Sequence, residues 1–229
     1  MMTRPVLIVA HGQPGDPGPQ QTAIEALAAR VARHLPGREV RGATLAAEGA
    51  LEAGLLADAL VYPMFMAGGW FTKVELPRRL ALTAVEGVEI LPPFGSDAGL
   101  PGLSLVLLRR AAAAQGWALE AVSLLIAAHG SGRSPAPAAA ARALAAALGG
   151  EVHQVGCGFV EEAPFLAEAA AGLGRQAICL PFFATSAGHV IEDLPRALTE
   201  AEFQGIVLPP LGLADEVPEM IAAAVLRAG

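Results

Sequence analysis

Short apolar runs and alanine-rich stretches alternate along the chain. The runs at residues 6–9 and 123–128 contain almost no polar residue, which is typical of strands covered on both faces. The alanine-rich stretches between such runs are long enough to form helices. We expect strands at residues 6–9, 39–44, 60–63, 88–91, 123–128, 151–157, 177–181 and 205–208. We expect helices at residues 20–35, 49–55, 74–83, 100–115, 137–148, 163–171, 191–201 and 215–228.

The same order of segments occurs twice, which indicates a duplication. Residues 6–12 match residues 124–130, which lie 118 positions later, and both segments end in His-Gly. The other matching pairs are 62–65 with 180–183, 75–80 with 193–198 and, at an offset of 117, 92–95 with 209–212. The sequence therefore predicts an N-terminal repeat at 1–118 and a C-terminal repeat at 119–229.

Strands that alternate with helices predict parallel sheets with helices on both faces. The expected fold class is α/β, with two similar halves that pack as a pseudo-dimer. Each half is expected to be a four-stranded, mainly parallel sheet flanked by helices. Ligands bind such sheets at the carboxyl ends of the strands, where loops lead into helices. His11-Gly12 and His129-Gly130 directly follow the first strand of each half, so they are expected at this edge.

The composition favours a globular protein with a large core. Hydrophobic residues make up 54% of the chain and charged residues 16%, against roughly 25% charged in an average soluble domain. Fifteen Lys and Arg against 22 Asp and Glu give a net charge of −7 without a basic run, so no nucleic-acid partner is expected. Cys157 and Cys179 lack the spacing of a metal site, and both are expected to be small core residues.

No segment approaches the ~20 uninterrupted apolar residues that span a bilayer, although the mean hydropathy is +0.50. The apolar run at residues 6–9 is too short for the core of a signal peptide. We therefore expect a cytoplasmic protein without a membrane segment.

Side chains that could bind a metal ion or accept protons occur mainly in the second half of the chain. At the offset of 118, His189 aligns with Phe71, and along the second strand Glu161 aligns with Ala46. The second half alone therefore combines His129, Glu161 and His189 at the ends of three strands. Two imidazoles and a carboxylate can bind a divalent transition metal or accept protons near neutral pH.

Each of these groups also has a plain structural interpretation. A histidine after a strand often only forms a hydrogen bond, and Glu161 and Glu162 before Pro164 are typical of charges at a helix N-terminus. The functional interpretation rests on convergence, because three suitable groups come from three strand ends and two of them are absent from the first half.

Two segments of the second half resemble a known family. They are Gly-Phe-Val-Glu-Glu at residues 158–162 and the segment at residues 181–195, which contains Gly188-His189. Together with the strand followed by His-Gly, they resemble the class II tetrapyrrole chelatases in their two-repeat form. These are the small sirohydrochlorin ferrochelatases and cobaltochelatases.

In that family two histidines and a glutamate form the metal-insertion site. The resemblance implies that His129, His189 and Glu161 are the catalytic residues and the metal ligands here. Because Phe71 and Ala46 depart from the pattern, it places the active site in the second repeat and a degenerate site in the first.

The resemblance also implies a substrate with eight carboxylates, so cationic and polar groups should surround it. The candidate substrate-binding residues are Ser131, Arg133, Ser186, Gly188 and His11.

Other candidates lie in the first half. Lys73, Arg78 and Arg79 are weaker candidates for the substrate carboxylates, with solvated surface charge as the alternative. Trp70 and Phe71 are candidates for an apolar wall against the ring, with packing in the core as the favoured interpretation.

The implied function is a lyase, a ferrochelatase that inserts Fe²⁺ into sirohydrochlorin to form sirohaem. Histidines suit the removal of pyrrole protons, and histidine with carboxylate binds the metal without trapping it. The alternatives are a cobaltochelatase of cobalamin biosynthesis that takes Co²⁺, a tetrapyrrole or metal carrier without catalysis, and a scaffold whose histidines only hold loops. The expected partners are sirohydrochlorin and a divalent metal, with no other cofactor, and the expected state is a monomeric pseudo-dimer.

Overall fold

The computed structural model describes residues 3–185 and 192–229. Its strands are β1 (Val6–Ala10), β2 (Val40–Thr44), β3 (Leu60–Pro63), β4 (Glu89–Ile90), β5 (Ser123–Ala128), β6 (Gln154–Phe159), β7 (Ala177–Pro181) and β8 (Ile206–Val207). Its α-helices are α1 (Pro17–Ala32), α2 (Ala50–Gly54), α3 (Leu76–Leu82), α4 (Leu100–Ala114), α5 (Ala136–Leu148), α6 (Leu166–Ala170), α7 (Asp193–Glu200) and α8 (Val217–Ala228). Each expected element is found, with its ends shifted by at most three residues.

The strands form two parallel sheets with the same topology. The strand order is β2-β1-β3-β4 in one sheet and β6-β5-β7-β8 in the other. The strand pairs within each sheet are parallel. Strands β1, β3, β5 and β7 are buried along their whole length, as expected for apolar runs covered on both faces. The predicted fold class is confirmed.

Besides α1, which lies three residues earlier than expected, the largest shifts fall around β6. Val152 is buried as a strand residue would be, but it lies in the turn after α5, and pairing with β5 begins only at Gln154. The strand therefore ends at Phe159, two residues before Glu161. Helix α6 begins later than expected, so Glu161 and Glu162 lie in the loop 160–165. Their interpretation as charges at a helix N-terminus is wrong, because no helix begins there.

The duplication is visible in the two cores. One cluster contains Leu7, Val9, Val61, Leu76 and Leu80. The other contains the residues 118 positions later, Leu125, Ala127, Cys179, Leu194 and Leu198. Equivalent positions of the two repeats therefore pack equivalent cores.

The two cysteines are free thiols. Cys179 is fully buried, and its burial raises the pKa of the thiol to about 12, so it is a small core residue as expected. Cys157 is only partly buried on the edge strand β6, and there too burial raises the thiol pKa. Neither thiol is therefore activated as a nucleophile.

The chain forms two compact units that each combine both repeats. The first unit contains residues 1–98 and 216–229, and the second contains residues 99–215. Helix α8 packs with α1 in the first unit, whereas α4 packs with α5 in the second. These units differ from the repeats predicted at 1–118 and 119–229. The last helix of each repeat, α4 or α8, belongs to the unit that contains the sheet of the other repeat. A repeat shows which residues are related, but not which sheet an apolar helix covers.

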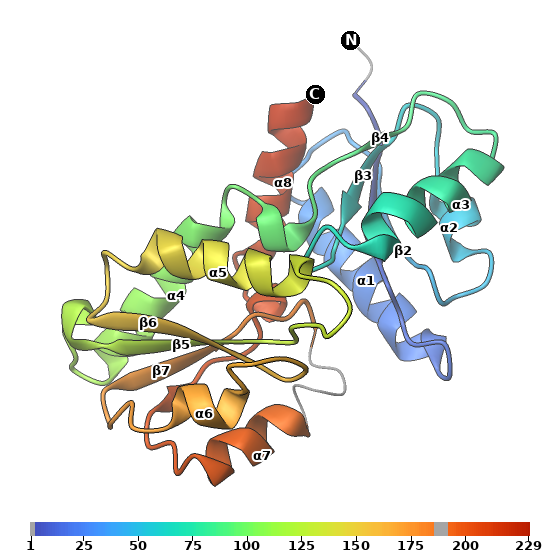
Figure 1. Ribbon diagram of the computed structural model, residues 1–229. Coiled ribbons are helices and arrows are strands. Elements are labelled where there is room, and N and C mark those ends of the chain that lie inside the picture. Colours follow the sequence, from blue (N-terminus) through green and yellow to red (C-terminus); the bar gives the residue numbers. More distant parts are fainter. Residues whose placement is uncertain (1–2, 186–191) are drawn as a thin grey trace. The chain divides into compact units, whose positions relative to one another are not determined.

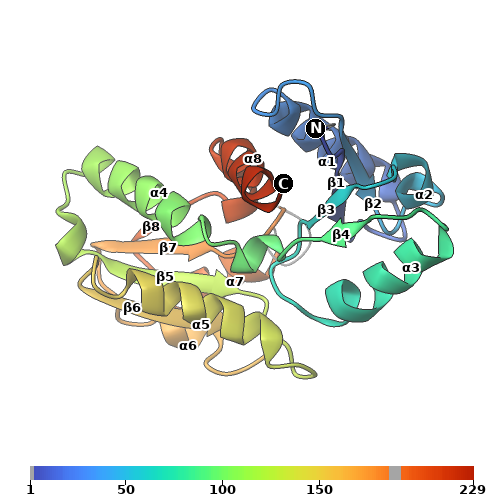
Figure 2. The same ribbon diagram turned by 90° about the horizontal axis from the view of Figure 1, so that it is seen from above.

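Helices cover both faces of each sheet. In the first unit α1 and α8 lie on one face, and α2 and α3 lie on the other (Figure 2). In the second unit α4 and α5 lie on one face, and α6 and α7 lie on the other (Figure 1). Within the described ranges, every helix is too short or too polar to cross a membrane. Loops follow the carboxyl ends of the strands.

Candidate active site

The ends of β5 and β6 bring two of the predicted site residues together. His129 directly follows β5, and Glu161 is the second residue after β6, whose last residue pairs with the last residue of β5. The Nε2 atom of His129 lies 3.8 Å from Oε1 of Glu161. Their side chains are 38% and 47% exposed, so solvent reaches both. An imidazole and a carboxylate in this arrangement can exchange protons or bind one metal ion.

The hydrogen bond of the His129 ring determines which of its two nitrogens can accept a proton or bind a metal ion. Its Nδ1 atom lies 2.9 Å from the carbonyl oxygen of Gly130. A carbonyl oxygen only accepts, so Nδ1 carries the proton in the neutral ring and Nε2 carries the lone pair. The basic nitrogen is therefore the one that faces Glu161. His11 repeats this geometry, with its Nδ1 atom 2.6 Å from the carbonyl oxygen of Gly12.

The loop after His129 packs tightly against the loop after β6. The backbone N–H of Ser131 donates to Oε1 of Glu162 at 2.8 Å. Gly130 has a φ of 67°, and a Cβ atom there would lie 2.9 Å from Cβ of Phe159. Only glycine fits this backbone and this space. This contact of Glu162 was not predicted from the sequence. The sequence feature that could have indicated it is that the first repeat has alanine at the position equivalent to Glu162.

Three of the predicted residues, Ser186, Gly188 and His189, lie outside the described residues. In residues 3–185 and 192–229, no cluster of three His, Cys, Asp or Glu side chains is arranged to hold a metal ion. His129 and Glu161 provide two of the three predicted donors. The position of the third is an expectation from the sequence.

The equivalent edge of the first unit has a different set of side chains. The backbone N–H of Ala46 donates to the His11 carbonyl oxygen at 3.0 Å, as that of Glu161 does to the His129 carbonyl oxygen, also at 3.0 Å. Ala46 therefore occupies the place of Glu161, as the alignment predicts. The ring of Phe71 meets the ring of His11 edge-on, with 4.2 Å between centroids. This edge presents an imidazole and an aromatic ring where the second unit presents an imidazole and a carboxylate.

Phe71 belongs to an aromatic group that also contains His11, Phe65 and Trp70. The ring of Trp70 lies 5.0 Å and that of Phe65 lies 6.2 Å from the Phe71 centroid. Trp70 is 58% exposed and Phe71 is 37% exposed. The favoured interpretation of these two residues as core is therefore wrong. They form an apolar surface at the carboxyl edge of the first sheet.

Arg133 keeps its charge available. It is exposed four residues after His129, and its backbone N–H donates to Oγ of Ser131 at 3.1 Å. Its guanidinium makes no ion pair with any side chain of the described ranges. Arg133 can therefore bind a carboxylate without losing an internal partner.

Arg78 and Arg79 are already engaged within the first unit. Arg78 pairs with Glu75 at 2.9 Å, and Arg79 pairs with Glu52 at 3.0 Å. Arg79 also donates to the carbonyl oxygen of Leu45 at 2.6 Å. The hydrogen bonds from these guanidinium groups lower the pKa of the Glu75 and Glu52 carboxyls. This favours the interpretation of both arginines as surface charges.

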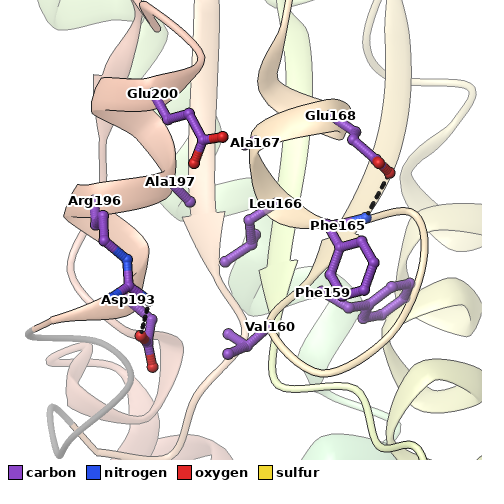
Figure 3. Close-up of a pocket in the computed structure, with 10 residues that line it drawn as sticks. All are labelled: Phe159, Val160, Phe165, Leu166, Ala167, Glu168, Asp193, Arg196, Ala197 and Glu200. Atoms are coloured by element: carbon purple, nitrogen blue, oxygen red, sulfur yellow. Dashed lines mark hydrogen bonds and ion pairs between the residues drawn. The ribbon is translucent and has the colours of Figure 1, made fainter.

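A groove of about 350 Å³ lies between α6 and α7 of the second unit (Figure 3). Apolar side chains such as Leu166 and Val160 line it, and the ion pair of Asp193 with Arg196, 2.6 Å long, lies beside them (Figure 3). Neither His129 nor Glu161 lines this groove. It is therefore separate from the pair at the strand ends.

Comparisons with known proteins match the second half to a family model and nearly the whole chain to solved structures. A family model described as CbiX matches residues 123–228. A solved structure of CbiX, the terminal enzyme for biosynthesis of siroheme in denitrifying bacteria, is 61% identical to this chain. The match covers 99% of this chain and 100% of that one, with a TM-score of 0.92. This chain belongs to the CbiX family. The resemblance to class II chelatases is thereby confirmed.

Two solved structures of SirB share the fold of this CbiX-family chain. SirB from Bacillus subtilis with Fe³⁺ is 16% identical, with a TM-score of 0.79. The sirohydrochlorin chelatase SirB from Bacillus subtilis subspecies spizizenii in complex with cobalt is 17% identical, with a TM-score of 0.71. Each match covers 99% of this chain and 95% of the other. The search of curated proteins found no match.

Proposed function

We propose that this CbiX-family protein is a sirohydrochlorin ferrochelatase, a lyase that inserts Fe²⁺ into sirohydrochlorin to form sirohaem. The observation that carries the proposal is the pairing of His129 Nε2 with Glu161 Oε1 at 3.8 Å. It occurs in the half that the CbiX family model matches. The 61% identical CbiX, described as the terminal enzyme of siroheme biosynthesis, supports the choice of reaction.

Metal insertion exchanges two pyrrole N–H protons for one divalent ion. In the proposed mechanism His129 accepts one proton at Nε2, and His189 accepts the other. Glu161 holds the ion while ring nitrogens replace the water ligands of the ion. A carboxylate suits this role because it binds such ions less tightly than a thiolate does. The half-exposed His129 side chain then releases its proton to solvent, and His189 releases the other. The metal is a substrate in this reaction.

The substrate-binding roles follow from charge and shape. Arg133 binds a carboxylate of the macrocycle with its exposed guanidinium, and Ser131, Ser186 and Gly188 supply polar contacts. His11 contacts the macrocycle together with the aromatic group around it, because exposed aromatic faces pack well on a flat ring.

The choice of iron is the finer part of the proposal. The description of the 61% identical CbiX favours iron. Cobalt is the alternative, because His and carboxylate ligands distinguish poorly between Fe²⁺ and Co²⁺. The monomeric pseudo-dimer and the cytoplasmic location are further expectations from the sequence.

The test is anaerobic incubation of the protein with sirohydrochlorin and Fe²⁺, Co²⁺ or Ni²⁺ in turn, followed by the tetrapyrrole absorption. We expect insertion well above the spontaneous rate, and faster with Fe²⁺ than with Co²⁺. The opposite metal order would support a cobaltochelatase. Binding of sirohydrochlorin without metal insertion would support a carrier. Absence of both binding and insertion would refute all three.

A further inference from the structure

Two backbone groups on either side of Gly130 are held by neighbouring residues of the loop 160–165. On one side, the His129 carbonyl oxygen accepts from the backbone N–H of Glu161 at 3.0 Å. On the other, the Ser131 N–H donates to the Glu162 carboxylate at 2.8 Å. The segment that carries the His129 side chain is therefore fixed at both ends by the segment that carries Glu161.

The first unit has only one of these two contacts. Ala46 donates to the His11 carbonyl oxygen, as Glu161 does to that of His129. The next residue is Ala47, whose methyl group cannot accept a hydrogen bond, and its own N–H donates to Oγ1 of Thr44 at 3.3 Å. The side-chain contact is thus specific to the unit that has a carboxylate facing its histidine.

We propose that Glu162 is a positioning residue for metal insertion, which rests on the proposed function. Its carboxylate holds the backbone after His129 so that Nε2 stays opposite Glu161. A hydrogen bond from an amide to a carboxylate is stronger than one to a neutral acceptor. Glu162 is half-buried, which reduces competition from water. The space that Gly130 leaves is filled by the Glu162 side chain, since a Cβ atom at residue 130 would lie 2.9 Å from Glu162 Cγ.

Three substitutions separate the hydrogen bond from the charge. Glu162→Gln keeps the length and an acceptor oxygen but removes the charge. Glu162→Asp keeps the charge but is one methylene too short to hold the 2.8 Å contact. Glu162→Ala removes both. If Glu162 positions His129, kcat for iron insertion follows the order wild type, Gln, then Asp and Ala together.

We expect kcat to fall about 10- to 100-fold in the Ala and Asp variants, as for other residues that orient a ligand. Glu162→Gln should stay within about threefold of the wild type. The KM for sirohydrochlorin should change less than kcat in all three variants, because the proposed role of Glu162 is to position His129 and not to bind the substrate. The matched control is Glu168→Ala. Glu168 also accepts a backbone N–H in this unit, that of Phe165 at 3.1 Å, but it does not contact the His129 loop. Its kcat should equal that of the wild type.

The outcomes distinguish this inference from the proposed function. If the wild-type protein inserts no metal, the proposed function fails. If the wild type is active and Glu162→Ala keeps its kcat, or if Asp retains activity while Gln loses it, the positioning role is refuted. Should Glu162→Ala fail to fold by circular dichroism, the comparison of Gln with Asp still decides.

Discussion

The carboxyl edges of the two sheets share a backbone and differ in side chains. In both, a His-Gly pair follows a central strand, the glycine has a positive φ, and Nδ1 of the histidine lies near the next carbonyl oxygen. Beside His11 stand Ala46 and the ring of Phe71, whereas beside His129 stands the Glu161 carboxylate. The duplicated backbone thus places an imidazole at the same position in both units, and the neighbouring side chains determine whether that imidazole faces a carboxylate or an aromatic ring.

The largest effect should come from removing one histidine at a time. His129→Ala should lower kcat for iron insertion by about 10²- to 10⁴-fold, the range for loss of a general base. His11→Ala should change mainly the KM for sirohydrochlorin, because this ring has no carboxylate facing it. His153→Ala is the control, since His153 is exposed and directly precedes β6, at the opposite end of that strand from Glu161. Equal losses of kcat in the first two variants would show that the first unit takes part in the chemistry.

The carboxylate gives the next largest effect. Glu161→Gln keeps the size of the side chain but weakens a metal ligand, so activity at low Fe²⁺ should fall about 10- to 100-fold. Initial rates over a series of Fe²⁺ concentrations measure this. Ala46→Glu adds a carboxylate at the equivalent position of the first unit, and it should not restore the rate in the Glu161→Gln background, because Phe71 still occupies the side of His11. A normal rate in Glu161→Gln would remove this residue from the mechanism.

The strands could be predicted because buried parallel strands leave a simple apolar pattern, and the duplication could be predicted because that pattern occurs twice. The exchange of α4 and α8 between units could not, since both helices are apolar enough to cover either sheet. Leu103 and Leu108 in α4 and Ile221 and Val225 in α8 are all buried in the structure. Their sequence gives no sign of which sheet they contact.

The candidate site was predictable where residues follow strands. His129 and Glu161 were expected at strand ends, and the register of β5 with β6 brings them together. The hydrogen bond of Glu162 was not predictable, because it depends on how two loops pack and not on a periodic pattern. The exposure of Trp70 was missed for a related reason, since a large aromatic residue after a buried strand is usually core.

The interiors of the two units differ as well. In the first, the Tyr62 hydroxyl donates to Asp97 at 2.8 Å, and Arg227 of α8 pairs with the same carboxylate at 3.2 Å. The equivalent positions of the second unit hold Leu180 and Ala214. The first unit thus attaches its last helix partly through a polar network around a carboxylate whose side chain is only 3% exposed.

Removing one hydroxyl tests this network. Tyr62→Phe keeps the packing but takes a donor from the buried Asp97 carboxylate, so the free energy of unfolding should fall by about 1–2 kcal/mol. Denaturant unfolding at neutral pH measures it. Ser96→Ala is the matched control, because it removes an exposed hydroxyl from the same turn, and it should stay within about 0.5 kcal/mol of the wild type. A wild-type value for Tyr62→Phe would mean that water or another group replaces the hydroxyl.

The smallest effect appears only in alkali. Burial first, and then the Asp97 charge, raise the pKa of Tyr62 far above its ordinary value of 10.0. The folded state therefore keeps the phenol proton where the unfolded state loses it, so the contribution to stability is complete below pH 10 and declines as the pH rises further. The free energy of unfolding of the wild type should fall above pH 10 more steeply than that of Tyr62→Phe. Tyr62 is the single tyrosine of the chain, so the tyrosinate absorbance reports it alone. That absorbance should rise together with unfolding, and a rise in the folded protein near pH 10 would show that Tyr62 is not isolated from solvent.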